Sequence, residues 1–123
     1  KFRDRIFQHR NALLEAIKNL RAGGELLGGY GASTKGNVLL QFCGLTPDEI
    51  PFIAEVNEEK FGHFTPGTGI PIISEAEMHQ RKPDVLLVLP WHFRENIIAR
   101  EEAFLARGGR LLFPLPSLEY FPQ

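Results

Sequence analysis

The sequence is poor in cysteine, methionine and tryptophan, with one residue of each type among 123. Its single cysteine, Cys43, excludes an internal disulfide and a cysteine-rich zinc site. No apolar run approaches the roughly 20 residues that a membrane-spanning helix needs, and the residues after Lys1 do not form a signal peptide. These absences predict a cytoplasmic protein that has no membrane as a partner.

The sequence also lacks an excess of charge of either sign. Lysine and arginine number 14 against 15 aspartates and glutamates, for a formal net charge of -1. Such a balance gives no global field that favours a nucleic acid polymer. Hydrophobic residues make up 43%, and the length suffices for one domain with its own core. Because the chain starts without methionine in a helical pattern, we expect it to be a piece of a longer protein.

Apolar periodicity predicts alternating strands and helices. An N-terminal helix over residues 2–21 carries the stripe Phe2, Ile6, Leu13, Ile17 and Leu20. Strands are expected over residues 25–30, 52–56, 70–73, 85–89 and 111–113. Helices are expected between Ser33 and Gly44, from Ser74 onward, and over residues 93–106. This alternation predicts an α/β fold, a mostly parallel, doubly wound sheet of order 3-2-1-4-5 with helices on both faces.

The domain boundaries follow from the same pattern. We expect residues 1–22 to form a helix that packs on the domain, residues 23–114 to form the α/β domain, and residues 115–123 to form a tail. Pro71 favours an edge position for the third strand, and Pro114 and Pro116 are expected to interrupt regular structure. The apolar tail either folds back on its own core or docks elsewhere.

A glycine-rich loop, GYGASTKG over Gly29–Gly36, follows the first predicted strand and opens a helix. This arrangement presents backbone N–H groups to a phosphate. Thr34 stands where a dinucleotide fingerprint has its third glycine, and Lys35 precedes the last glycine, so the loop matches neither that fingerprint nor a P-loop. A cation at Lys35 opposes the helix dipole by roughly 0.3–1 kcal/mol, which an anionic ligand would reverse. A tight turn that binds nothing is the alternative.

Two further loops are expected at the same edge of the sheet, where ligands bind in doubly wound folds. One begins at Glu55, placed where an acidic residue often holds ribose hydroxyls, and carries Lys60. The other carries Trp91 and His92, which could stack on a base and contact a phosphate. We expect it to face the glycine-rich loop across a crevice, unless Trp91 packs under the next helix.

Several motifs in order resemble one family. They are GYGASTKG at Gly29–Gly36, FCG at Phe42–Gly44, KFG at Lys60–Gly62, TPGT at Thr65–Thr68, IPI at Ile70–Ile72, PD at Pro83–Asp84 and LPWHF at Leu89–Phe93. Together they resemble the C-terminal domain of S-adenosylmethionine-dependent sugar C-methyltransferases, over about Leu26 to Pro114. The resemblance implies a Rossmann-like three-layer sandwich. It also implies an upstream domain that binds S-adenosylmethionine and a zinc-binding N-terminal domain, so this segment alone is not expected to be active.

The resemblance implies that this domain binds a nucleotide-linked, dTDP-type deoxysugar and contacts the upstream methyltransferase domain. The residues expected to bind substrate are Gly31, Ala32, Ser33, Thr34, Lys35, Gly36, Lys60, Thr65, Pro66, Gly67, Thr68, Trp91 and His92. No catalytic, metal-ligating or cofactor-binding residue is expected within the segment. Two alternatives remain open: an NAD(P)-type dinucleotide-binding domain of an oxidoreductase, which Glu55 supports, and a non-catalytic interaction module.

Overall fold

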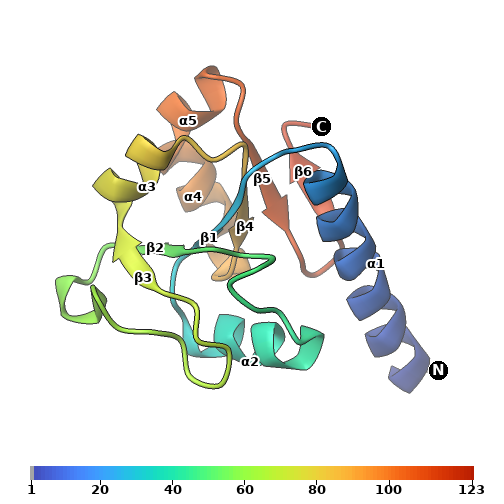
Figure 1. The fold of residues 1–123 in the computed structure, drawn as a ribbon. Helices are drawn as coiled ribbons and strands as arrows, with labels where there is room; N and C mark the ends of the chain where they lie inside the picture. The colour runs from blue at the N-terminus through green and yellow to red at the C-terminus, as the bar shows by residue number, and fades with distance from the viewer. Residues whose placement is uncertain (1) are drawn as a thin grey trace.

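The computed structural model describes residues 2–123 (Figure 1). Side chains are described from Arg5 onward, with the exception of Ile6. Phe2 and Ile6 of the predicted apolar stripe therefore lie outside the described side chains. None of the described helices is both long enough and apolar enough to cross a membrane.

A six-stranded sheet of order β3-β2-β1-β4-β5-β6 forms the centre of the molecule. Its strands are β1 (Leu27–Tyr30), β2 (Ile53–Glu55), β3 (Ile72–Ser74), β4 (Val85–Val88), β5 (Arg110–Phe113) and β6 (Glu119–Phe121). The first five are parallel, which confirms the predicted doubly wound order and the edge position of β3. The carboxyl ends of these five strands therefore share one edge.

The sixth strand corrects the expectation that residues 115–123 lack regular structure. β6 pairs antiparallel with β5, with Leu112 opposite Tyr120. The Arg110 guanidinium lies 4.3 Å from the centre of the Tyr120 ring, and Phe121 packs against the core on the opposite face. Side-chain packing thus draws the chain back to the sheet after the prolines, and the tail covers its own domain.

Helices cover both faces of the sheet (Figure 1). They are α1 (Phe2–Ala22), α2 (Thr34–Cys43), α3 (Glu75–Arg81), α4 (Arg94–Arg100) and α5 (Glu102–Ala106), with short 3₁₀ helices at Glu58–Lys60 and Trp91–Phe93. α1 and α2 pack on the face that carries Val85 and Leu87, and α3, α4 and α5 pack on the face that carries Leu86 and Val88. β4 is therefore buried on both sides, as its continuous apolar run predicts.

The single helix predicted over residues 93–106 is wrong in detail. A 3₁₀ turn precedes it, and Glu101 separates α4 from α5. The Glu101 side chain is turned into the protein, where it is 3% exposed and accepts a hydrogen bond from the Tyr30 hydroxyl at 2.9 Å. A buried carboxylate of this kind needs a donor, and the break in the helix coincides with the residue that reaches it.

Candidate functional site

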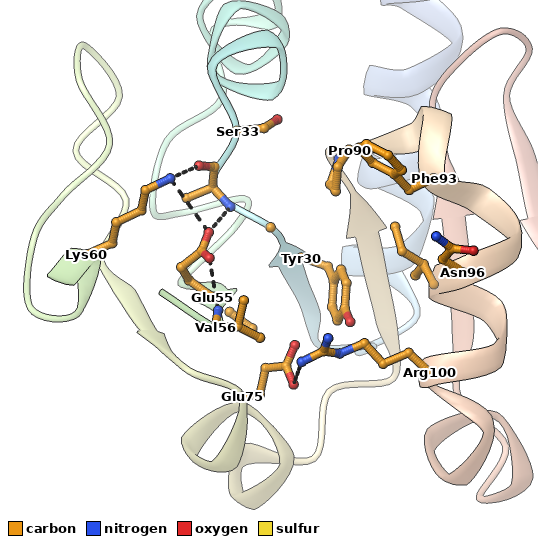
Figure 2. Close-up of a pocket in the computed structure, with 14 residues that line it drawn as sticks. Tyr30, Ser33, Glu55, Val56, Lys60, Glu75, Pro90, Phe93, Asn96 and Arg100 are labelled. Atoms are coloured by element: carbon orange, nitrogen blue, oxygen red, sulfur yellow. Dashed lines mark hydrogen bonds and ion pairs between the residues drawn. The ribbon is translucent and has the colours of Figure 1, made fainter. Parts of the chain in front are cut away.

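A crevice of about 520 Å³ lies beside the loops that follow β1 and β4, at the carboxyl edge of the sheet (Figure 2). The β1–β4 boundary is the topological switch point of this strand order, where ligands bind in doubly wound folds. Gly31 has φ +84° there, and a Cβ at this position would lie 2.7 Å from Cδ of Pro90. A glycine is required because the two loops approach each other this closely.

One wall of the crevice is held together by Glu55 at the end of β2. Its carboxylate accepts hydrogen bonds from the backbone amides of Ala32 at 2.9 Å, Val56 at 2.9 Å and Asn57 at 3.0 Å. Lys60 completes the arrangement by donating to the Ala32 carbonyl at 2.7 Å, with its Nζ 3.9 Å from Glu55 Oε1. Glu55 thus ties the loop after β2 to the glycine-rich loop after β1.

These contacts leave fewer backbone amides for a ligand than the sequence predicts. The amides of Gly31 and Ser33 donate to the carbonyls of Ala54 and Gly31, and the amide of Ala32 donates to Glu55. The Gly36 amide donates to Ser33 Oγ, the predicted N-cap of α2.

Four of the six amides expected to receive a phosphate are therefore already bonded within the protein. Only the amides of Thr34 and Lys35 have no acceptor recorded among the described residues. Both lie in the first turn of α2.

The opposite wall comes from α3 and α4 (Figure 2). Glu75 accepts a hydrogen bond from Arg100 at 3.0 Å, and this ion pair spans the mouth of the crevice. The Glu75 hydrogen bond and charge raise the pKa of Arg100 above its ordinary value. Phe93 and Asn96 lie further along the same wall. The walls thus combine two cations, two carboxylates and an amide side chain around an apolar floor.

Tyr30 forms part of that floor. Burial raises the pKa of its hydroxyl well above the ordinary value, and the negative charge of Glu101 raises it further. The hydroxyl stays protonated and donates to Glu101. Behind this pair, His79 Nε2 lies 3.6 Å from Glu101 Oε1. Tyr30 therefore lines the floor of the crevice as a neutral phenol whose hydroxyl is bonded to Glu101.

Lys60 separates the crevice from a second hollow of about 330 Å³ that shares Ala32 and Ser33 with it. The second hollow brings together Thr34, Thr65 and Pro66 from the predicted set. Thr65 is buried, hydrogen-bonds to Thr68, and accepts from the Ile70 amide at 2.9 Å.

Gly67 and Thr68 of the same loop line neither hollow. The Pro66 carbonyl accepts from Gln41, and Gly67 lies against the Gln41 side chain. Thr65 and Thr68 thus have a clear structural role in shaping the loop.

The expected opposite wall of Trp91 and His92 is corrected by the structure. Trp91 and Lys35 line a separate groove of about 400 Å³ between α1 and α2. We call this the α1–α2 groove; its lining residues are Arg5, His9, Arg10, Leu13, Lys35, Val38, Leu39, Phe42, Trp91, Pro114 and Leu115. His92 is exposed and stacks on Phe93.

Phe93, Asn96 and Arg100, which the sequence analysis did not select, form the crevice wall in place of Trp91 and His92. Their helical spacing is the signal that would have found them.

Comparison with known proteins identifies the family. Residues 1–116 match the family described as the C-methyltransferase C-terminal domain. The chain is 39% identical over 108 residues to the C-methyltransferase NovU of Streptomyces niveus, covering 88% of this chain and 26% of the relative. It therefore spans about a quarter of the length of that relative. The motif-based resemblance is confirmed, and the chain belongs to the family of C-methyltransferase C-terminal domains.

Proposed function

We propose that this chain is the substrate-binding domain of an S-adenosylmethionine-dependent C-methyltransferase that acts on a nucleotide-linked deoxysugar of the dTDP type. The observation that carries the proposal is the crevice at the β1–β4 switch point in a member of this family. Among the described residues that line the crevice, no hydroxyl or thiol lies beside a base that also lines it, and we infer a role in binding.

The groups around the crevice suit a sugar nucleotide. Arg100 and Lys60 supply positive charge for a diphosphate. The amides of Thr34 and Lys35 lie at the N-terminus of α2, directly after Ser33 of the crevice wall. Glu75 and Asn96 would accept and donate hydrogen bonds to sugar hydroxyls. Thr65 and Pro66 would then border the nucleotide from the second hollow.

Methyl transfer would be completed by the rest of the polypeptide. S-adenosylmethionine supplies the methyl group when bound there, and we place the general base and any zinc site in that part as well. The residues present here do not fit an adenosine-bearing cofactor, because Thr34 replaces the third fingerprint glycine and the Glu55 carboxylate accepts three backbone amides. The same contacts argue against the dinucleotide-binding alternative. This domain would contribute orientation, which is worth roughly 7–11 kcal/mol in favourable intramolecular reactions.

Calorimetric titration of the chain with dTDP tests the proposal. We expect binding at millimolar or lower concentration, weakened about tenfold by Arg100→Ala, since a hydrogen bond to a charged group contributes about 1.5–3 kcal/mol. Lys35→Ala tests whether the start of α2 receives the phosphate. Lys18→Ala is the matched control, because Lys18 is exposed on α1 and lines neither the crevice nor the α1–α2 groove.

Two outcomes would change the assignment. If the chain binds no dTDP at millimolar concentration while the longer protein does, the nucleotide contacts belong to the rest of the polypeptide. If NAD raises the unfolding temperature and dTDP does not, the oxidoreductase alternative replaces the proposal.

A further inference from the structure

The α1–α2 groove has an apolar floor and a basic border. Leu13, Leu39 and Trp91 line it together with Pro114 and Leu115. Val38 and Phe42 of the groove are 61% and 40% exposed, and Phe7, which lies outside the groove beside Phe42, is 38% exposed. A contiguous apolar surface of this kind on a domain marks a contact with another molecule.

The border of the groove carries positive charge. Arg5, Arg10 and Lys35 surround it with His9, and no acidic side chain lines it among the described residues. A negatively charged partner would therefore meet a complementary field, which governs partner choice at interfaces.

Arg10 gives a second, independent observation. Its Nε is buried and has no hydrogen-bond acceptor within the described part of the chain. Its guanidinium lies 5.1 Å from the centre of the Phe7 ring and 5.6 Å from that of Phe42. Arg10 as a whole is only partly buried, so the rest of its guanidinium group can meet a carboxylate of a partner. An arginine held between aromatic rings is also typical of residues that dominate binding energy at interfaces.

We propose that the α1–α2 groove docks an acidic segment with an apolar anchor from the rest of the C-methyltransferase polypeptide. The inference rests on the proposed function, in which this chain is joined to a catalytic portion. The region of NovU that matches this chain is only 26% of that protein, so NovU is long enough to contain a separate catalytic portion. The N-terminal half of α1 runs past the carboxyl end of β5 and lies beside α2, away from the sheet (Figure 1).

A polypeptide fits this surface better than a nucleotide does. Phe7 is 38% exposed and does not line the groove, so a ligand confined to about 400 Å³ would leave it in water. A docked segment would cover the groove and its apolar surroundings together. An apolar side chain of the segment would enter beside Leu13 and Trp91, and the carboxylates of the segment would face Arg5 and Arg10.

Hydroxyl-radical footprinting of the isolated chain and of the full-length protein tests the docking. Oxidation of Phe7 and Phe42 is expected to fall at least fivefold in the full-length protein. The double variant Arg5→Glu, Arg10→Glu should restore it, and Val38→Asp should restore it through the apolar contact alone. Lys18→Glu, on the same helix and outside the groove, should leave the protection unchanged. Urea unfolding of each isolated variant confirms that the domain itself is intact.

Three results would overturn the docking inference. One is equal oxidation of Phe7 and Phe42 in both proteins, and another is protection that survives the arginine reversals. The third is protection of the isolated chain by dTDP alone, which would make the groove a nucleotide site. Methyl transfer from labelled S-adenosylmethionine to a dTDP-keto sugar by the full-length protein is measured separately. Loss of docking with methyl transfer present refutes only this inference, whereas absence of methyl transfer refutes the proposed function.

Discussion

Replacing Glu55 with alanine should destabilise the domain, because its carboxylate joins two loops of the crevice. Of its three amide hydrogen bonds, those to Val56 and Asn57 are exposed, and water can replace them. The bond to the Ala32 amide is partly buried at 2.9 Å and is charge-assisted, which corresponds to about 1.5–3 kcal/mol. Lys60 adds only about 0–1 kcal/mol, since its side chain is 43% exposed. The expected total loss is about 2–3 kcal/mol.

Urea unfolding of the chain measures this loss. With an m-value of about 1.5 kcal/mol/M, the midpoint should fall by about 1.3–2 M. Glu59→Ala, an exposed carboxylate in the same loop, is the matched control and should change stability by less than about 0.5 kcal/mol. The stability of Glu55→Gln should lie between those of Glu55→Ala and Glu59→Ala. The glutamine oxygen can still accept a backbone N–H, but its NH₂ group would face backbone N–H donors. Equal stability of Glu55→Ala and Glu59→Ala would refute the structural role, and Glu55 would again be a candidate for ligand hydroxyls.

Three further predictions concern other parts of the fold. Gly36→Ala should lower stability by about 1–3 kcal/mol despite the better helix propensity of alanine, because the new Cβ would lie 2.4 Å from Cβ of Leu89; a urea midpoint at or above wild type would contradict this. Burial raises the pKa of the Cys43 thiol, so it should react with iodoacetamide far more slowly in the folded chain than in urea at the same pH; equal rates would show that Cys43 is accessible. Burial alone would raise the pKa of Glu49, but hydrogen bonds from the Thr46 hydroxyl and amide outweigh it and lower the pKa. The ionised form is therefore favoured by folding, and its stabilisation is present above the unfolded-state pKa and lost as the pH falls through the folded-state pKa. The stability difference between wild type and Thr46→Ala should accordingly shrink on acidification, and a constant difference from neutral to acidic pH would refute the assignment.

The strand order could be predicted because apolar periodicity, and the residues that begin and end helices and strands, can be read along the whole sequence. The apolar run at Val85–Val88 indicates a strand buried on both faces, and Pro71 indicates an edge. Ser33 and Gly44 bound α2 as an N-cap and a left-handed C-cap. These are local signals. Because parallel crossover connections are right-handed, the elements that these signals predict allow only a few strand orders.

Long-range contacts decided what the sequence analysis missed. In β6, Tyr120 packs against Arg110, and Glu101 at the helix break bonds to the Tyr30 hydroxyl, 71 positions away along the chain. Neither partner is marked by local periodicity.

The direction of single side chains decided the composition of the crevice. Side chains in a 3₁₀ turn emerge about 120° apart, so Trp91 and Phe93 of the same turn enter different hollows. The amides of the glycine-rich loop were correctly placed at the carboxyl edge, but the acceptor for Ala32 comes from Glu55 in the loop after β2. Loop positions follow from topology, whereas the atoms that a loop offers to a ligand follow from its contacts.

The central claim is that a sugar nucleotide binds at the carboxyl edge of the sheet, and amide chemical shifts of the isotope-labelled chain during a dTDP titration test it most directly. We predict saturable shifts at Asn96 in the crevice and at Thr34 and Lys35 at the start of α2, with none at Lys82 and Asp84, which lie at the opposite edge before β4. Shifts concentrated at Lys82 and Asp84, or saturable binding without a shift at Thr34, Lys35 or Asn96, would contradict the account.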